Sequence, residues 1–167
     1  MKNILLGLLV SLSIIGCSSD TKPEVNVEPA LVVGKSLSSL SLNDQFEKAN
    51  GIADTTKKVI FVFSDDMGHL CNDYFVTKEA SYLSNNNTQF VADISAAPSL
   101  IRSMFIMPGL KDFKHPVLIL SEKEVSAPYR AKMNTEKAVV VYVSNKEITS
   151  IKTISTKEEL ISTIEAK

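Results

Sequence analysis

The sequence predicts an α/β domain in which helices cover both faces of a mixed central sheet of about five strands, in three layers. Three observations predict this fold class. The run Val59–Phe63 is entirely apolar, β-branched or aromatic, which is typical of a strand buried on both faces. Apolar residues at helical spacing follow it as far as Leu83. Two further apolar runs near the C-terminus flank a short polar turn, as in a β-hairpin.

The N-terminus has the pattern of an export signal. A positive start at Met1–Asn3 precedes the apolar stretch Ile4–Ile15, which is too short to span a bilayer comfortably. We therefore expect a signal peptide over residues 1–16. The segment Ile14–Cys17 resembles the lipobox of bacterial lipoproteins, in which diacylglycerol is linked to the cysteine thiol and the chain is cleaved just before it. The alternative is an ordinary secretory leader with an incidental cysteine.

The lipobox resemblance implies that Cys17 is the lipid-attachment residue and that acyl chains such as palmitate hold the protein on a membrane. Residues 17–30 are mostly polar and predict a flexible tether. The implied location is the bacterial cell envelope. Because position 18 is not Asp, the resemblance is compatible with the outer membrane, facing the periplasm, in a Gram-negative cell.

The globular domain is expected over residues 31–167. The partly alternating segment Leu31–Leu42 predicts a short strand or hairpin before Val59. A polar turn is expected at Ser64–Cys71, followed by a helix that ends at Asn85–Asn87.

Further elements follow in β-α-β order. Strands are predicted at Gln89–Ile94 and at Val117–Leu120. Between them, Ser99–Phe113 has helical spacing interrupted at Pro108–Gly109, and we expect its methionines and phenylalanines to be core residues. The segment Ser126–Asn134 is expected to be a loop or a single helical turn.

The C-terminal part predicts a hairpin and a final helix. Strands Ala138–Val143 and Ile148–Ile154 flank the polar turn Ser144–Glu147. The segment Ser155–Glu158 is interpreted as a capping box, which opens a helix that carries the apolar residues Leu160, Ile161 and Ile164.

This arrangement resembles the thioredoxin-like fold of peroxiredoxins and periplasmic thioredoxins, over Leu31–Ala166. The resemblance rests on the opening Val33–Asp44, on the strand and turn that end at Cys71, and on the terminal hairpin followed by Thr156–Leu160. The motif positions differ. Where thioredoxins carry Cys-x-x-Cys, this chain has Gly68-His69-Leu70-Cys71.

Two more departures concern the same chemistry. Peroxiredoxins carry Pro-x-x-x-Thr-x-x-Cys, and here Ser64 and Gly68 stand in place of the proline and the threonine. A proline expected just before the penultimate strand is also missing, because Thr135–Lys137 stands there. The resemblance therefore implies the fold, but the residues that do the family's chemistry are degenerate.

Cys71 is the candidate catalytic residue. A helix N-terminus would favour its thiolate, whereas Asp65 and Asp66 oppose it, and a cysteine on an apolar helix face is commonly a small buried hydrophobe. His69 is a second candidate, because it could orient or deprotonate the thiol, although neighbouring helix residues point apart. His115 is interpreted as the marker of a strand start, and no metal site is predicted from the two histidines.

Composition excludes other classes. The chain has 167 residues, 44% of them hydrophobic, and a formal net charge of -1 without a basic stripe, so long-range electrostatics favour neither nucleic acid nor an anionic membrane surface as a partner. No cofactor is predicted. If Cys17 is lipidated, Cys71 has no cysteine in the chain to pair with.

Two function classes remain. The first is an envelope lipoprotein that is not a dithiol oxidoreductase and acts as a binding or accessory module for an envelope protein or a small ligand. The alternative is a one-cysteine, peroxiredoxin-like thiol peroxidase. In that enzyme Cys71 would be oxidised to sulfenic acid and regenerated by an external thiol reductant.

Overall fold

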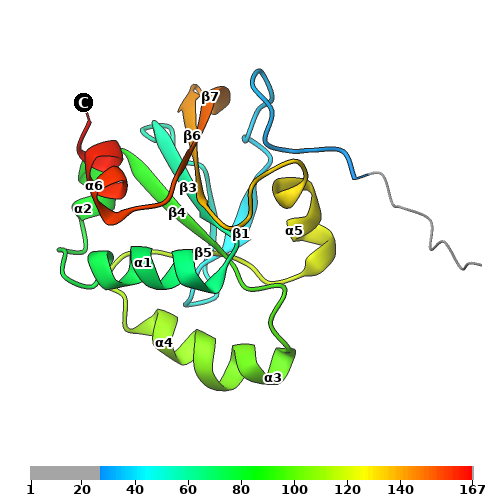
Figure 1. Cartoon of the computed structure of the whole chain (residues 1–167), viewed down its shortest axis with the longest axis vertical. Coiled ribbons are helices and arrows are strands. Elements are labelled where there is room, and N and C mark those ends of the chain that lie inside the picture. The colour runs from blue at the N-terminus through cyan, green and yellow to red at the C-terminus, as the bar shows by residue number, and fades with distance from the viewer. Residues whose placement is uncertain (1–26, 167) are drawn as a thin grey trace, which may run out of the picture.

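Five strands form the central sheet in the order β5-β4-β3-β6-β7 (Figure 1). The structure is a computed structural model and describes residues 27–166. Strands β3 (Lys58–Val62), β4 (Thr88–Asp93) and β5 (Leu118–Leu120) run parallel to one another. Strands β6 (Ala138–Ser144) and β7 (Glu147–Ile154) complete the sheet in antiparallel pairings. The expected mixed sheet is therefore confirmed.

Strand β3 lies at the centre of the sheet, as its composition predicts. All of its residues are buried. Ile60 pairs with Phe90 of β4 on one side and with Val140 of β6 on the other. A central strand that is covered on both faces has no solvent-facing positions, which explains its continuous apolar run.

One face of the sheet is covered by α1 (Asp65–Phe75), α2 (Tyr82–Asn85), α6 (Lys157–Glu165) and the helical segment Ser99–Lys111 (Figure 1). That segment consists of α3 (Ser99–Ile101), the π-helical turn η1 (Arg102–Ile106) and α4 (Met107–Lys111), in an unbroken run that we call the π-containing helix. The core beneath includes Ile60, Val62, Met67, Cys71, Phe75, Phe90, Leu110, Leu160 and Ile164.

The opposite face is covered by α5 (Lys123–Arg130) and by the N-terminal part of the domain. The short hairpin of β1 (Ser41–Asn43) and β2 (Ala49–Gly51) lies there. A hairpin is therefore present before Val59, but it begins only at Ser41, later than the segment Leu31–Leu42 in which it was expected. The second core includes Leu31, Leu37, Leu40, Leu42, Ile52, Val59, Phe61, Val91 and Val139. Alternate residues of β3 thus enter the two cores, and helices occupy both faces as expected.

The start of α1 differs from the sequence interpretation. The segment Ser64–Cys71, expected to be a turn, is helical from Asp65 onward. Ser64 is the N-cap, its hydroxyl accepts from the Met67 amide, and Asp65 and Asp66 lie in the first turn. Ser-Asp-Asp is a strong helix-start signal as well as a turn signal, which explains the difference. The helix also ends earlier, at Phe75, and Leu83 belongs to α2.

Two other segments also differ from expectation. The segment Ser126–Asn134, expected to be a loop or a single helical turn, is helical as far as Arg130, but this helix, α5, begins earlier, at Lys123. Tyr129 of α5 packs against Phe61, with ring centroids 5.8 Å apart. The capping box lies one residue later than expected, between Thr156 and Glu159. The hairpin between β6 and β7 is confirmed.

No helix within residues 27–166 has both the length and the apolar character needed to cross a membrane. The expected signal peptide, the lipid-attachment residue Cys17 and most of the expected tether lie outside the described residues. They therefore stay predictions.

Candidate functional site

A cleft of about 790 Å³ opens where β3 and β4 end, between α1 and the π-containing helix. The carboxyl ends of parallel strands are the usual place for ligands in open α/β sheets. The last residues of the two strands and those just after them form its floor. These are Val62, Phe63, Ala92, Asp93 and Ile94.

The α1 wall of this cleft is polar. It consists of Asp65, Gly68, His69, Asn72 and Asp73, whose spacing places them on one face of the helix. The Nε2 atom of His69 lies 3.5 Å from Oδ1 of Asp65, and both side chains are largely exposed. The side-chain oxygen of Asn72 is buried and has no hydrogen-bond donor among the described residues.

The opposite wall is apolar and belongs to the π-containing helix. Ile101, Phe105, Ile106, Leu110 and Phe113 line it, and Phe105 is 65% exposed.

The exposure of this helix contradicts one expectation. Its methionines and phenylalanines were expected in the core, but Met104 and Phe105 are exposed, as are Leu100 and Ile101. Leu110 is buried in the core instead, and only Met107 and Phe113 of the expected residues pack against it, partly buried. The segment is apolar on more than one side, and only one side can face the sheet.

Pro108 does not interrupt the helix as expected. It lies near the start of α4, directly after the π-helical turn, where the Met107 amide donates to the carbonyl of Arg102. A π-helical turn can accommodate a residue that lacks an amide hydrogen within a continuous helix, and such turns are frequent at functional sites.

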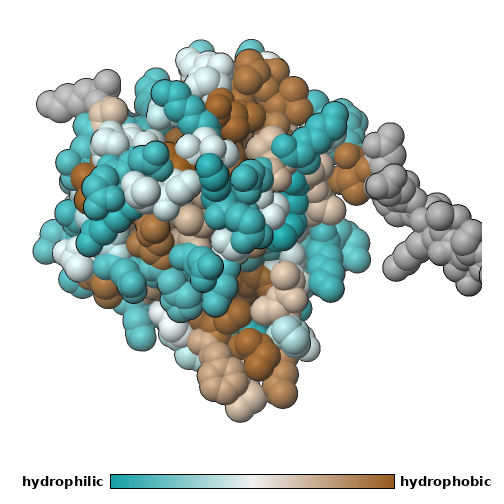
Figure 2. Space-filling view, viewed as in Figure 1, coloured by the Kyte–Doolittle hydropathy of each residue, from teal (hydrophilic) through white to brown (hydrophobic). Residues whose placement is uncertain are grey.

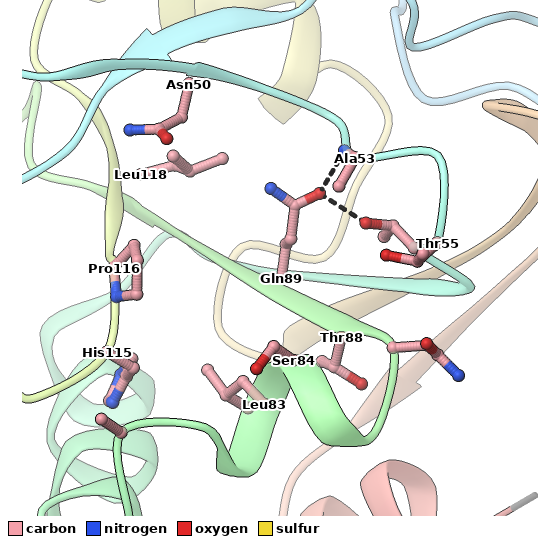
Figure 3. A pocket seen from close by; sticks show the side chains of 13 residues that line it. Asn50, Ala53, Thr55, Leu83, Ser84, Thr88, Gln89, His115, Pro116 and Leu118 are labelled. Atoms are coloured by element: carbon pink, nitrogen blue, oxygen red, sulfur yellow. Dashed lines mark hydrogen bonds between the residues drawn. The ribbon is translucent and has the colours of Figure 1, made fainter.

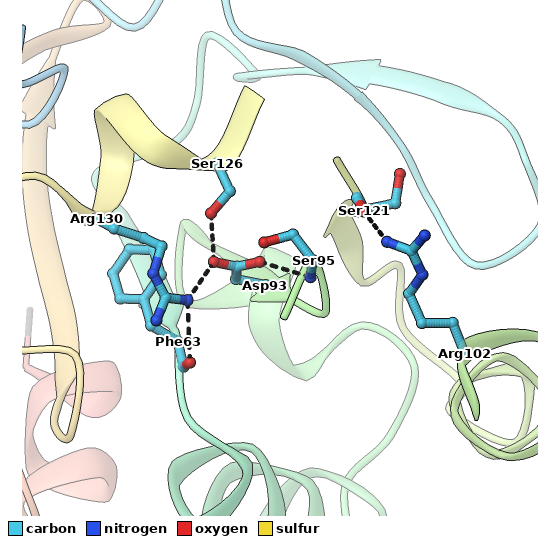
Figure 4. A network of polar contacts seen from close by, with 7 residues as sticks. All are labelled: Phe63, Asp93, Ser95, Arg102, Ser121, Ser126 and Arg130. Atoms are coloured by element: carbon cyan, nitrogen blue, oxygen red, sulfur yellow. Dashed lines mark hydrogen bonds and ion pairs between the residues drawn. The ribbon is translucent and has the colours of Figure 1, made fainter. Parts of the chain in front are cut away.

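Asp93, at the end of β4, is the centre of a polar network below the cleft (Figure 4). Its buried carboxylate accepts hydrogen bonds from the Ser95 amide at 2.8 Å, from the Ser126 hydroxyl and from Arg130 Nη1 at 2.7 Å. Burial acts to raise the pKa of Asp93, but the hydrogen bonds from Ser126, Arg130 and Ser95 outweigh it and hold the pKa below its ordinary value. Because Arg130 also donates to the Phe63 carbonyl at 3.3 Å, the network ties α5 to both parallel strand ends.

The structure places Cys71 in the core and not in the cleft. It lies in the second turn of α1, is fully buried, and belongs to the same cluster as Ile60 and Phe75. Burial raises the pKa of its thiol to about 12. A buried thiol that stays protonated is a poor nucleophile. Within residues 27–166, it is the only free cysteine.

Cys71 and His69 are not brought together. His69 lies on the exposed, cleft-facing side of α1, whereas Cys71 faces the sheet. The helix therefore separates the two candidate catalytic residues, and their catalytic roles stay predictions that this geometry does not favour.

His115 is buried, which the sequence interpretation missed. Its ring packs edge-on against Phe75, with centroids 5.2 Å apart, and its Nε2 atom has no hydrogen-bond partner among the described residues. Burial lowers the pKa of His115 to about 4, so the ring is neutral at pH 7. Phe113, two residues earlier in the sequence, also packs against the His115 ring, with centroids 5.6 Å apart. An aromatic residue so close in the sequence was the one signal that His115 could be buried.

A smaller pocket of about 190 Å³ lies beside His115 (Figure 3). Among its polar groups, the Gln89 side-chain oxygen accepts from the Ala53 amide at 3.0 Å and from the Thr56 hydroxyl at 2.6 Å. The Nε2 atom of His115, which lines this pocket, has no partner among the described residues. In the described part of the chain, no three His, Cys, Asp or Glu side chains lie close enough together to hold a metal ion.

No family model matches the sequence, and no curated protein matches it either. Solved structures do match. The thioredoxin domain of a thiol-disulfide oxidoreductase from Bacteroides vulgatus is 12% identical over 81% of this chain and 96% of that chain, with a TM-score of 0.51. A peroxiredoxin-like protein from Aquifex aeolicus is 11% identical over 83% of this chain and 89% of that chain, with a TM-score of 0.50.

A third match is an exposed lipoprotein thioredoxin from Streptococcus pneumoniae, which is 12% identical over 77% of this chain and 98% of that chain, with a TM-score of 0.50. Identities this low bear on the fold and leave activity open. The strand order, the mixed sheet and these structural neighbours agree: this chain has the thioredoxin-like fold.

Proposed function

We propose that this protein is a cell-envelope lipoprotein whose thioredoxin-like domain binds a partner through the cleft and is not a dithiol oxidoreductase. One observation carries the proposal. At the ends of the parallel strands, the domain has an open cleft with an exposed apolar wall, and no cysteine within residues 27–166 lines it. The site is thus suited to binding rather than to thiol exchange.

The start of α1 supports the non-redox part of this proposal. Thiol exchange needs an attacking thiolate, which a helix N-terminus stabilises, and normally a second thiol within reach. Here the helix starts with Ser64, Asp65 and Asp66. The two carboxylates already interact with the positive end of the helix dipole, where a thiolate would otherwise be stabilised. Cys71 is buried in the core and does not reach this end of the helix.

Activity assays test this part directly. We expect insulin disulfide reduction and thiol-dependent peroxide consumption to stay at background in the native protein and in Cys71→Ser. Either activity, if present in the native protein and lost in Cys71→Ser, would favour the alternative of a one-cysteine peroxidase or another thiol enzyme and would overturn the proposal.

The lipid anchor rests on the sequence around Cys17. Replacement of Cys17 by Ser should release the protein from the membrane fraction, and the native protein should carry the mass of acyl chains. A Cys17→Ser variant that still sediments with membranes, together with an unmodified native mass, would contradict the anchor.

Binding at the cleft can be tested with a neutral apolar dye, N-phenyl-1-naphthylamine. We expect its fluorescence to increase with native protein and to fall in Ile101→Ser and Phe105→Ser, which remove apolar groups from the cleft wall. Leu100→Ser and Met104→Ser are matched controls, because these residues are exposed on the same helix but do not line the cleft. Equal loss in both pairs, or no binding by the native protein, would refute the cleft as the apolar site.

A further inference from the structure

We infer that the occupant of the cleft is a protein segment with apolar side chains between two basic residues. This inference rests on the proposed function and specifies the partner of that same site. It follows from the different chemistry of the two cleft walls and from the apolar surface beyond them.

The charged side chains that line the cleft are mainly acidic. Asp65, Asp73 and Asp93 line it together with His69, and no lysine or arginine among the described residues does. Asp93 is already paired with Arg130, so its charge is compensated within the domain. The remaining acidic groups are Asp65 and Asp73, which lie on the exposed α1 wall. His69 lies 3.5 Å from Asp65, whereas Asp73 has no ion-pair partner among residues 27–166. A partner that enters between the walls therefore meets an acidic wall without lysine or arginine beside it, which favours a cation.

The spacing of the two carboxylates limits where the partner's cations lie. Asp65 and Asp73 are eight residues apart on one face of α1, which corresponds to about 12 Å along the helix axis. An extended peptide rises by about 3.3 Å per residue, so it spans this distance in about four residues. Basic residues separated by three others would match both carboxylates.

The apolar wall of the cleft favours apolar residues between the two basic residues of the partner. Ile101 and Phe105 face the α1 wall across the cleft, above a floor that includes Phe63. An apolar side chain of the partner would cover them and bury surface that now contacts water.

The partner extends beyond the cleft. Leu100 and Met104, which are 64% and 59% exposed, continue the apolar surface over the outer side of the same helix. Figure 2 shows apolar side chains gathered over this helix, at the bottom of the view. A small molecule held in the cleft would leave this surface uncovered, whereas a protein would cover it. An anionic membrane surface would be repelled by Asp65 and Asp73.

Two synthetic peptides test the inference: acetyl-Lys-Leu-Phe-Leu-Lys-amide and the same peptide with Glu in place of Lys. Binding is followed by NMR titration of the backbone amides, which does not depend on the dye. We expect the lysine peptide to bind about tenfold more tightly at low salt and to perturb the amides of α1 and of the π-containing helix.

The charge preference should disappear in the double variant Asp65→Asn/Asp73→Asn and when salt is added. The matched control is Asp66→Asn/Asp112→Asn, which removes two exposed carboxylates that do not line the cleft and should keep the preference.

Three outcomes would overturn the inference. These are equal binding of both peptides, no binding of either, and binding of phosphatidylglycerol vesicles that Phe105→Ser abolishes. If the dye still binds to the cleft in those cases, the proposed function stands and only the partner class fails. If the dye also fails to bind, the proposed function itself has failed.

Discussion

Replacement of His115 by leucine should remove a pH-dependent loss of stability that the buried ring causes. The folded protein holds His115 neutral, because burial lowers the pKa of the ring from 6.5 to about 4. In the unfolded chain the ring takes up a proton below its ordinary pKa. Between pH 6.5 and 4 the unfolded state therefore binds more protons, and the free energy of unfolding falls as the pH falls.

The magnitude follows from the two pKa values. Their difference corresponds to about 3 kcal/mol, at about 1.4 kcal/mol for each pKa unit. The contribution of this ring is complete above pH 6.5, is lost as the pH falls to about 4, and does not change below that. Leucine has a similar volume, does not titrate, and removes the Nε2 atom that lacks a partner.

Urea unfolding at several pH values between 7 and 4 measures this effect. Circular dichroism is the suitable signal, because the chain has no tryptophan. Over this range the free energy of unfolding of the native protein should fall by about 3 kcal/mol more than that of His115→Leu. Taking the difference between the two proteins at each pH cancels the contribution of the carboxylates, which both proteins share. A stability difference between the two proteins that stays constant with pH would refute the reasoning. His69→Asn is the control, since His69 is exposed and its replacement should leave the loss unchanged.

Three further predictions concern buried polar groups. Cys71→Ser should lower the free energy of unfolding by about 1–2 kcal/mol, because it places a hydroxyl among apolar side chains, and urea unfolding measures this. Lys58→Met should cost about 2 kcal/mol and speed hydrogen exchange in α6, because the Lys58 ammonium donates to the carbonyls at the end of that helix; exposed Lys57→Met should do neither. Arg130→Met should cost about 2 kcal/mol at pH 7 and less as the pH falls through the lowered pKa of Asp93, because a protonated carboxyl no longer needs a cation beside it; a cost that does not change with pH would contradict the role of the ion pair.

Local sequence signals predicted the C-terminal hairpin well. The apolar runs of β6 and β7 are long, and the turn between them places Asn145 and Lys146 at positive φ values of 50° and 66°. Such turns suit asparagine and match the twist of the strands they join. Both signals are short-range, so they do not depend on the rest of the fold.

The candidate site was less predictable. The position of Cys71 in the sequence is compatible with a reactive thiol at a helix start, but the helix begins at Asp65 and turns the thiol toward the sheet. The exposure of Met104 and Phe105 likewise depends on which side of their helix packs on the sheet. When a helix is apolar on more than one side, its own sequence does not show which of those sides faces the sheet.

The sequence by itself determined the α/β class, the central position of β3 and the order of the main elements. Those features depend on periodicity, on continuous apolar runs and on turn residues, all of which act between near neighbours. Only the tertiary structure decided that Cys71 and His115 are buried, that Asp93 pairs with Arg130, and that an apolar wall faces an acidic one across a cleft. These features depend on contacts between segments far apart in the chain, because burial and charge pairing are set by which helix face meets the sheet.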